Sequence, residues 1–478
     1  MKRNAALLLL ILVMALTLSG CLFSAPEDLY QSPERSADYL SLTQTIQNLK
    51  ATLAQQYGAE VSDTSVMAGN NTAQIQLQDL DGDGLRETAV TFFRISEAEK
   101  PLKICFFTKT AEDTYTVSAM VEGNGSSIYR VDYVDLDGSG YREVVVSWQM
   151  STGSYLLGAY SIEEPMSRNV HKVALPASSQ TTVPTPIPQL TQLKATEWMT
   201  TAYSGYTITD IDQDTRSEVA VARLGTGGVN NAVDVYGWRD GSFLIESTAP
   251  LSDGIVSLEV NGVKENFVAG EVPARALYVS SQLSDGRRAV DILTYQGEHL
   301  ANLTLEEEGV SREQLDRYVD LDPTDVNSDG ILELPSPVPL PGSEESATSD
   351  FLLIDWYQYS QSGRRTMVCT TYHNVSDGWY LVIPQEWKSQ IVLRRNDSAS
   401  GQRAVIFYHT DGNQETPFLV IYKFTSQFER ATISNRFELR REDDAVYAAA
   451  FYDSGWNPGI SETDLLASFH LIQSSWAD

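Results

Sequence analysis

The sequence predicts a mainly β protein: a β-propeller of about five blades, followed by a small α+β domain. A propeller of seven blades is the alternative. Three observations carry this prediction. An acidic motif recurs over residues 61–385, and each copy runs into a β-branched strand. A hairpin signal follows the motifs. After residue 385 the motif stops, and residues 386–478 form short apolar runs that end in an amphipathic helix.

Residues 1–20 have the features of an export signal. Lys2 and Arg3 are basic, and the apolar run over residues 7–16 is too short to cross a bilayer comfortably. The run ends at Leu18-Ser19-Gly20-Cys21, which resembles the lipobox of bacterial lipoproteins. That resemblance implies that Cys21 is lipidated and anchors the mature chain to the outer face of the bacterial cell membrane. An ordinary secretory signal with a chance cysteine is the alternative.

Residues 21–60 connect the expected anchor to the repeats. Ser32 followed by Pro33 is typical of a helix start. Apolar residues then recur every three or four positions, at Tyr39, Leu42, Ile46, Leu49, Leu53 and Tyr57. This stripe predicts a helix that packs on the neighbouring domain, and a short coiled coil is the alternative.

The composition excludes some functions. The chain has 64 acidic and 34 basic residues, a net charge of −30. Such a surface repels nucleic acid and anionic lipid and attracts divalent cations. Besides Cys21 the chain has only Cys105 and Cys369, too few for a disulfide scaffold or a cysteine-based zinc site. Whether these two thiols pair is left open.

Four copies of a nine-residue motif organise the middle of the chain. Each has an acid at position one, an acid or amide at position three, a turn at positions four to six, and Glu at position nine. The copies cover residues 79–87, 135–143, 210–218 and 325–333. The last interval is about twice the first, so a worn copy is expected inside it. Residues 284–292 fit, because they keep an Asp-Gly turn before a strand.

A segment with the pattern of a β-hairpin follows each motif in the sequence. An example is Asp240-Gly241 between the aromatic segments at Tyr236 and Phe243. The count is about five repeats of roughly four short strands each, with periods near those of propeller blades.

The repeat resembles the FG-GAP/VCBS class, which occurs in integrin-type propellers and many exported bacterial proteins. The resemblance covers about residues 60–385. It implies calcium bound by the side chains at positions one, three, five and nine and by the backbone carbonyl at position seven. The implied ligands are Asp79, Asp81, Asp83, Leu85, Glu87, Asp135, Asp137, Ser139, Tyr141, Glu143, Asp210, Asp212, Asp214, Arg216, Glu218, Asp325, Asn327, Asp329, Ile331 and Glu333.

Oxygen-rich loops of this kind suit Ca²⁺, which takes six to eight oxygen ligands. The motif opens like an EF-hand loop, but an EF-hand needs Glu at position twelve and flanking helices. Position twelve here is Val90, Val146, Val221 or Ser336, and strands follow. The EF-hand interpretation therefore fails. Asp-rich turns without metal, in which the side chains cap their own backbone, are the alternative.

The four copies differ in quality. The first is complete. Ser139 lowers the charge of the second, and Thr215 in the third stands where glycine would permit a positive φ. The fourth has Asn327, but its acids and Gly330 are in place. We therefore expect the first and fourth loops to bind the ion best.

The segments outside the motifs are less specific. Pro-rich stretches at residues 183–188 and 334–341 predict extended loops or edge strands. Residues 386–478 predict a meander with a final helix capped at Ser461. The apolar face of that helix is expected to comprise Leu465, Leu466, Phe469 and Ile472. A strand followed by Ile383-Pro384, Trp387 and Lys388 around the start of this region resembles PsbP-like domains of exported proteins.

No catalytic constellation is evident from the sequence. The histidines lie in no Gly-x-Ser-x-Gly or His-Glu-x-x-His motif; they are His171, His299, His373, His409 and His470. The sequence favours a lipid-anchored, calcium-binding module that binds a protein or glycan at the cell surface, or an assembly lipoprotein, and not an enzyme. An exported hydrolase with an acidic site in the propeller is the alternative.

Overall fold

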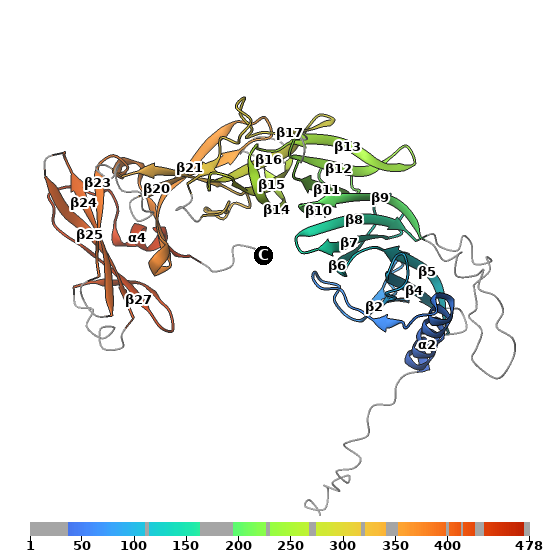
Figure 1. The fold of residues 1–478 in the computed structure, drawn as a ribbon. Coiled ribbons are helices and arrows are strands. Elements are labelled where there is room, and N and C mark those ends of the chain that lie inside the picture. The colour runs from blue at the N-terminus through green and yellow to red at the C-terminus, as the bar shows by residue number, and fades with distance from the viewer. Residues whose placement is uncertain are drawn as a thin grey trace, which may run out of the picture. The chain divides into compact units, whose positions relative to one another are not determined.

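The computed structural model describes residues 37–109, 114–162, 195–225, 230–266, 274–316, 321–340, 352–397, 401–412, 414–425 and 435–472. The expected signal, Cys21, Ser32 and the Pro-rich stretch at 183–188 lie outside these residues. The chain divides into two compact units: Met1–Ser127 with Ile162–Thr196, and Ile128–Ser161 with Glu197–Asp478. The predicted mainly β fold is confirmed. Strands form six antiparallel sheets in the described residues, and most of the strands in each sheet are consecutive in the chain (Figure 1).

The first unit contains one sheet and a helix. The sheet has the order β1-β3-β4-β5, and β2 pairs with β3; the bounds are β1 Ser62–Asp63, β2 Ile75–Gln78, β3 Thr88–Arg94, β4 Leu102–Lys109 and β5 Tyr115–Gly123. Helix α2, Ala37–Tyr57, packs on it through the predicted stripe from Leu42 onward, whereas Tyr39 is exposed. Leu42, Ile46, Leu49 and Leu53 are buried against residues such as Phe93. The helix is confirmed, and its stripe meets the first sheet.

The second unit begins with two four-stranded sheets. The first has the order β6-β7-β8-β9, with β6 Ser127–Val134, β7 Glu143–Ser151, β8 Ser154–Ser161 and β9 Thr196–Tyr203. The second has the order β10-β11-β12-β13, with β10 Gly205–Thr209, β11 Glu218–Arg223, β12 Ala232–Arg239 and β13 Ser242–Pro250. The predicted Asp240-Gly241 turn joins β12 to β13, and both residues have positive φ, +54° and +80°.

The next sheet shows that the prediction of a worn motif copy at residues 284–292 is wrong. Its order is β14-β15-β16-β17, and β18 pairs with β16; the bounds are β14 Ile255–Asn266, β15 Ala274–Leu283, β16 Arg288–Gln296, β17 His299–Asn302 and β18 Gln314–Leu315. Asp285 and Gly286 lie in the hairpin between the second and third strands. The motifs at 79–87, 135–143 and 210–218 instead precede the second strand in the order of their sheets, and the motif at 325–333 precedes the first strand of the fifth sheet, Leu334–Pro339. The Asp-Gly turn is therefore an ordinary hairpin turn and not a worn copy.

The fifth sheet includes the last strand of the described residues. Its order is β19-β20-β21-β22-β28, with β19 Leu334–Pro339, β20 Leu352–Tyr359, β21 Arg365–Asn374, β22 Trp379–Ile383 and β28 Phe469–Leu471. The Pro-rich strand β19 lies at the edge, as predicted, because proline cannot donate to a ladder. The short 3₁₀ helix Val375–Asp377 joins β21 to β22, and a second, Gln385–Trp387, follows β22.

The sixth sheet has the order β23-β24-β25-β27-β26. Its strands are β23 Ile391–Asn396, β24 Gln402–Thr410, β25 Glu415–Phe424, β26 Phe437–Arg441 and β27 Val446–Phe451. Its buried Phe407 and Tyr447 share one core cluster with Tyr372 and Trp379 of the fifth sheet. The hydrophobic core is therefore continuous across the domain boundary expected at residues 385/386.

The final helix α4, Glu462–Ser468, begins as predicted. The Ser461 hydroxyl accepts from the Asp464 N–H, and the Asp464 side chain accepts from the Ser461 N–H, which completes a capping box. The expected helical face is wrong at its end. Phe469 begins strand β28 and pairs with Leu381 of β22, and Ile472 follows that strand. Pairing with a free sheet edge replaces another turn of helix.

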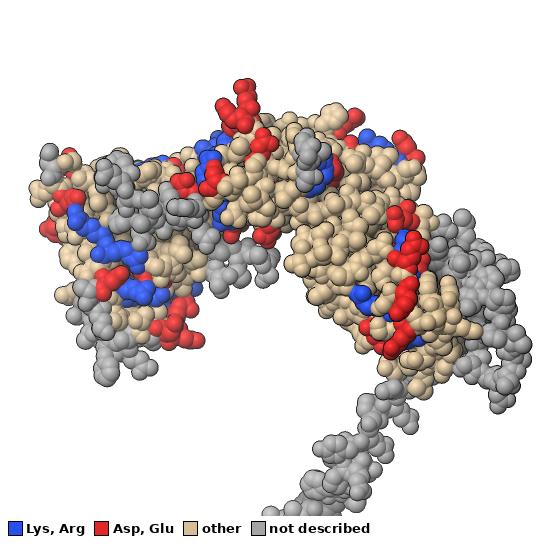
Figure 2. Space-filling model, in the orientation of Figure 1, with Lys and Arg blue, Asp and Glu red and all other residues tan. Residues whose placement is uncertain are grey.

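Acidic and basic side chains are interspersed over the face of the molecule drawn in Figure 2. Many form ion pairs, such as Arg223 with Asp234 at 2.6 Å. No helix among the described residues is long and apolar enough to cross a membrane. Cys105 is buried, Cys369 is half-buried, and both thiols are free.

Candidate metal centre

The four acidic motifs form loops at equivalent places in their sheets. We call them loop one (79–87), loop two (135–143), loop three (210–218) and loop four (325–333). Loops one to three connect the first strand to the second: β2 to β3, β6 to β7, and β10 to β11. In loop four the first strand is reduced to a single bridge between Thr324 and Glu333, directly before β19. Strand pairing on both sides therefore fixes the two ends of each loop.

The first acid of each loop closes the turn in the same way. Its carboxylate accepts a hydrogen bond from the backbone N–H at position six. The N···O distances are 3.2 Å for Asp79, 2.9 Å for Asp135, 3.2 Å for Asp210 and 2.8 Å for Asp325. The loop thus folds back over its first carboxylate.

Positions three and five repeat a second pattern. The side chain at position three accepts from the N–H at position five, at 3.4, 2.9, 3.0 and 3.0 Å in loops one to four. The side chain at position five accepts from the N–H at position seven, at 2.7, 3.2, 2.8 and 2.9 Å. Alternate side chains are therefore turned toward the inside of the loop, which is the arrangement that the sequence predicts.

Positive φ angles make this turn possible. Position four has φ between +61° and +74°, at Gly82, Gly138, Gln213 and Ser328. Position six has φ between +78° and +90°, at Gly84, Gly140, Thr215 and Gly330. Thr215 therefore adopts the left-handed conformation that its position demands, despite its branched Cβ. Thr215 thus has the positive φ that glycine would adopt without strain at this position.

The glutamate at position nine has a structural partner in three loops. Glu143, Glu218 and Glu333 are buried, and each accepts a hydrogen bond from the backbone N–H of position two at 2.8–2.9 Å. Burial raises the pKa of Glu143 to about 7, of Glu218 to about 8 and of Glu333 to about 7, and the neighbouring aspartates add to the effect. Each buried carboxyl thus lacks enough compensating positive charge in the protein alone.

The acids of each loop converge on one point. In each of four sets, three carboxylate oxygens lie within 4.8 Å of one another and can hold a metal ion. The sets are Asp79, Asp81 and Asp83; Asp135, Asp137 and Glu143; Asp210, Asp212 and Glu218; and Asp325, Asp329 and Glu333. Glu87 and Asp214 are predicted ligands that these sets do not include. Ser139 and Asn327 line the same turns, and Leu85, Tyr141, Arg216 and Ile331 hold position seven.

One buried atom fits a bound cation directly. Asp210 Oδ1 in loop three is buried and has no hydrogen-bond partner in the described part of the chain. A buried carboxylate oxygen without a donor carries a desolvation cost that a coordinated cation removes. The oxygen-only side chains of the four sets fit a hard divalent ion.

Loops one, three and four each have a neighbouring side chain from another strand, and this neighbour differs from loop to loop. The motif alone could not predict these neighbours. Gln358 on β20 donates to Asp329 Oδ2 at 2.7 Å and to Glu333 Oε1 at 2.5 Å. Arg275 on β15 forms an ion pair with Asp210 at 3.2 Å. The charge of Lys109 on β4 lowers the pKa of Glu87, although burial and the loop's aspartates raise it overall. Each loop therefore has its own electrostatic surroundings.

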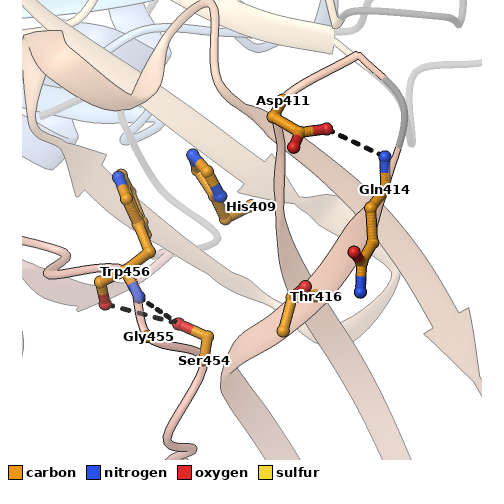
Figure 3. Close-up of a pocket in the computed structure, with 7 residues that line it drawn as sticks. All are labelled: His409, Asp411, Gln414, Thr416, Ser454, Gly455 and Trp456. Atoms are coloured by element: carbon orange, nitrogen blue, oxygen red, sulfur yellow. Dashed lines mark hydrogen bonds between the residues drawn. The ribbon is translucent and has the colours of Figure 1, made fainter.

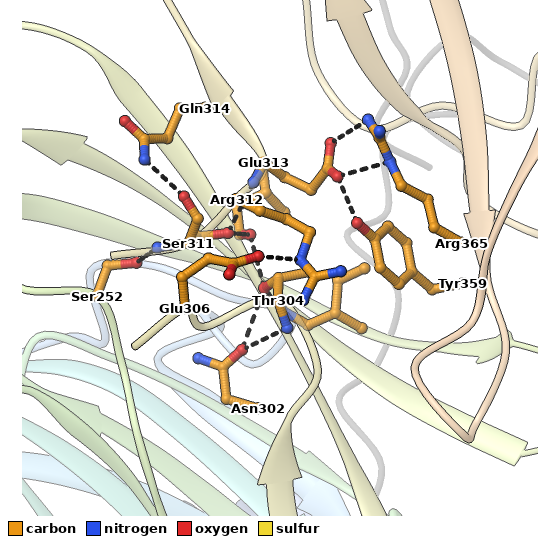
Figure 4. Close-up of polar contacts among 12 residues, drawn as sticks. Ser252, Asn302, Thr304, Glu306, Ser311, Arg312, Glu313, Gln314, Tyr359 and Arg365 are labelled. Carbon is orange, nitrogen blue, oxygen red and sulfur yellow. Dashed lines mark hydrogen bonds and ion pairs between the residues drawn. The ribbon is translucent and has the colours of Figure 1, made fainter. Parts of the chain in front are cut away.

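Two buried acids outside the loops are held by protein donors. Glu313 accepts from the Tyr359 hydroxyl and forms an ion pair with Arg365 at 2.9 Å (Figure 4). Asp291 accepts from the N–H and hydroxyl of Ser252 and from the Asn302 amide. Burial raises the pKa of Asp291. These contacts connect the segment around residues 302–313 to β16 and to strands β20 and β21 of the fifth sheet.

Comparisons with known proteins place the chain in no family. No family model matches the sequence, and no curated protein matches it. Among solved structures, one similar chain is the crystal structure of BBS1N in complex with ARL6DN, soaked with lead. It shares 9% sequence identity, and the match covers 84% of this chain and 98% of that one with a TM-score of 0.21. A TM-score this low does not establish a shared fold.

Proposed function

We propose that this chain is an exported, lipid-anchored protein whose four acidic loops bind Ca²⁺, and that it acts as a binding or assembly module at the outer face of the bacterial membrane. In this proposal the sheets are propeller blades of the FG-GAP/VCBS type. The calcium ions are structural: they hold the first two strands of a blade at their common end. The ligand of the module is a protein or a glycan.

One observation carries the proposal: four loops, far apart in the sequence, have the same backbone turn and each gathers three carboxylates within 4.8 Å. The third acid of each set also accepts a backbone N–H of its own loop, but backbone capping alone does not require three carboxylates to converge on one point. Three carboxylates at this distance repel one another unless a cation neutralises them. The alternative of metal-free turns therefore leaves the cost of the third acid unexplained.

Calcium is the ion that best suits these ligands. The sets contain only oxygen donors, without histidine or cysteine, which favours a hard cation over zinc or copper. The loops supply ligands from a flexible turn, which suits Ca²⁺ better than the strict octahedron of Mg²⁺. Extracellular calcium at millimolar concentration is sufficient to fill weak sites.

The experiment compares thermal unfolding of the mature chain in about 2 mM CaCl₂ and in EGTA. This calcium concentration is on the order of that found outside cells. We expect a higher Tm in CaCl₂, because an ion that binds only the folded chain stabilises it, by about 2.7 kcal/mol at a hundred times its Kd. Asp137→Asn, which keeps an acceptor but removes a charge from loop two, should reduce the difference.

Asp285→Asn is the matched control. Asp285 also stands in an Asp-Gly turn, and its carboxylate also accepts a backbone N–H two residues on, at 3.0 Å, but it belongs to no converging set. The control should keep the full difference in Tm between CaCl₂ and EGTA. Equal Tm values of the unsubstituted chain in both solutions would refute calcium binding at the loops.

A further inference from the structure

A small cavity lies at one end of the sixth sheet, outside the four acidic loops. It has a volume of about 240 Å³ and is lined by His409, Asp411, Gln414, Thr416, Ser454, Gly455 and Trp456 (Figure 3). The lining comes from the hairpin between β24 and β25 and from the loop after β27. None of these residues belongs to an acidic loop, so the cavity is chemically separate from the metal centre.

One wall of the cavity is aromatic and held in place. The rings of His409 and Trp456 stack with centroids 4.5 Å apart and planes at 15°. Trp456 in turn packs edge-to-face on Phe418 at 4.8 Å. The buried Trp387 donates its indole N–H to the Pro458 carbonyl at 2.7 Å, which fixes the same loop. The wall is therefore supported by the core of the sheet and not by the ligand.

The opposite side of the cavity is polar. Thr416 pairs directly with His409 across β24 and β25, so the two side chains lie on the same face of the sheet. Gln414 lies beside Thr416 at the end of the hairpin (Figure 3). The hairpin itself is closed by Asp411 Oδ1, which accepts from the Gln414 N–H at 2.9 Å. An amide and a hydroxyl thus face an aromatic wall across a short gap.

These side chains have hydrogen-bonding capacity to spare. In the described residues, no hydrogen bond is made by the Gln414 side-chain amide, the Thr416 hydroxyl, the His409 ring nitrogens or the Trp456 indole N–H. Together they offer both donors and acceptors. A ligand with several hydroxyl groups matches this mixture, because each hydroxyl can donate and accept.

The lining also excludes several ligand classes. It contains no lysine or arginine, so a phosphate, sulfate or carboxylate would meet Asp411 without a counter-charge. A lipid chain would need a continuous apolar channel, and the lining is mostly polar. A volume of about 240 Å³ is below the range of drug-sized sites and suits a single small ring.

We propose that this cavity binds one pyranose ring of a neutral saccharide. The C–H groups of one sugar face pack on the His409 ring, which Trp456 backs. The sugar hydroxyls donate to the Asp411 carboxylate, and they exchange hydrogen bonds with the Gln414 amide and the Thr416 hydroxyl, which can each donate and accept. The inference rests on the proposed binding role and narrows its ligand from a protein or glycan to a glycan.

The test measures binding of methyl glycosides of glucose, galactose, mannose and N-acetylglucosamine to the mature chain by saturation-transfer NMR and calorimetry. We expect at least one to bind with a Kd on the order of millimolar, as for a small ligand in a shallow site. Gln414→Ala and Thr416→Val each remove one hydrogen-bonding group and should weaken binding about fivefold. Gln414 is exposed and Thr416 is half-buried, and Val has nearly the shape of Thr, so the fold should persist.

Gln402→Ala is the matched control, because Gln402 stands at the other end of β24 from His409. It should bind the sugar like the unsubstituted chain. Binding that Gln414→Ala and Thr416→Val leave unchanged would overturn the proposal. Absence of binding by every glycoside, or preference for an amine such as lysine methyl ester, would also overturn it.

The binding measurement is made in CaCl₂ and in EGTA, below the melting temperature, so that the sugar proposal and the metal proposal are tested separately. Sugar binding in both solutions without calcium stabilisation would refute the metal proposal alone.

Discussion

The Arg275 guanidinium lies 3.2 Å from the carboxylate of Asp210, so the first acid of loop three has a cation of the protein beside it. Arg275 also donates to the Asp210 carbonyl. Loop three thus combines a partly neutralised acid with a buried carboxylate oxygen that lacks a donor. If calcium binds loop three as proposed, the ion and Arg275 would share the neutralisation of one carboxylate.

Arg275→Gln should therefore make the protein more dependent on calcium. Without the guanidinium, the acids of loop three repel one another more strongly in EGTA, and we expect a loss of about 1 kcal/mol there. In CaCl₂ the ion compensates, and the loss should be smaller. Urea unfolding in both solutions measures the two values. Arg287→Gln removes an ion pair with Asp285, outside the loops, and serves as control; equal losses for Arg275→Gln in both solutions would contradict the shared role.

Gln358→Glu tests the surroundings of loop four. The Gln358 amide donates to Asp329 and Glu333, so a carboxylate in its place would add repulsion without an ion. With calcium it would add a charged ligand, which raises affinity. We expect a lower Tm in EGTA and a larger gain on adding calcium than in the unsubstituted chain.

Gln282→Glu is the control for this change, since Gln282 is an exposed side chain on β15. It should leave the calcium gain unchanged. If Gln358→Glu lowered Tm by the same amount in both solutions, loop four would not hold an ion near residue 358.

The position-nine glutamates predict a pH dependence of the metal-free protein. Their pKa values are raised, to about 7 for Glu143 and Glu333 and about 8 for Glu218. Between the unfolded value near 4.5 and these folded values, the folded state binds more protons than the unfolded state. The free energy of unfolding in EGTA should therefore fall as the pH rises from about 5 to 8.

Calcium should reverse this trend, because it binds the deprotonated carboxylates and releases their protons. The measurement is urea unfolding at several pH values in EGTA and in CaCl₂. Glu218→Gln should flatten the slope in EGTA, since glutamine does not titrate. If the free energy of unfolding in EGTA rose over the same pH range, burial would not raise the pKa of these carboxyls.

Thr215→Gly tests the strain in loop three. Thr215 has φ +78°, which costs a β-branched residue roughly 1–2 kcal/mol that glycine does not pay. Part of the gain is lost to the greater freedom of glycine in the unfolded chain. We expect a net stabilisation of about 0.5–1 kcal/mol by urea unfolding. Thr207→Gly, in the extended strand β10, should destabilise, and a loss at both positions would contradict the strain.

Local features of the fold could be read from the sequence. The stripe from Leu42 to Leu53 predicted helix α2 and its buried face, and Ser461 with Asp464 predicted the capping box of α4. Alternating acids and turn glycines predicted the convergence within each loop. In each case the residues concerned are close together in the sequence, so spacing alone fixes their geometry.

Features that depend on strand pairing could not be predicted. Gln358 reaches Glu333 because β20 pairs with β19, and Arg275 reaches Asp210 across 65 residues. Phe469 left the predicted helix because the edge of β22 was available to it. The Asp285-Gly286 turn keeps only the Asp-Gly turn of an acidic loop, and its place between β15 and β16 follows from the register of the whole sheet.

Anomalous scattering from crystals of the mature chain grown in saturating CaCl₂ tests calcium coordination most directly. The account predicts peaks inside the loops, at least at loops one and four, each within about 2.3–2.6 Å of the converging carboxylates. Loops that keep their backbone turns with water in place of an anomalous scatterer would contradict it.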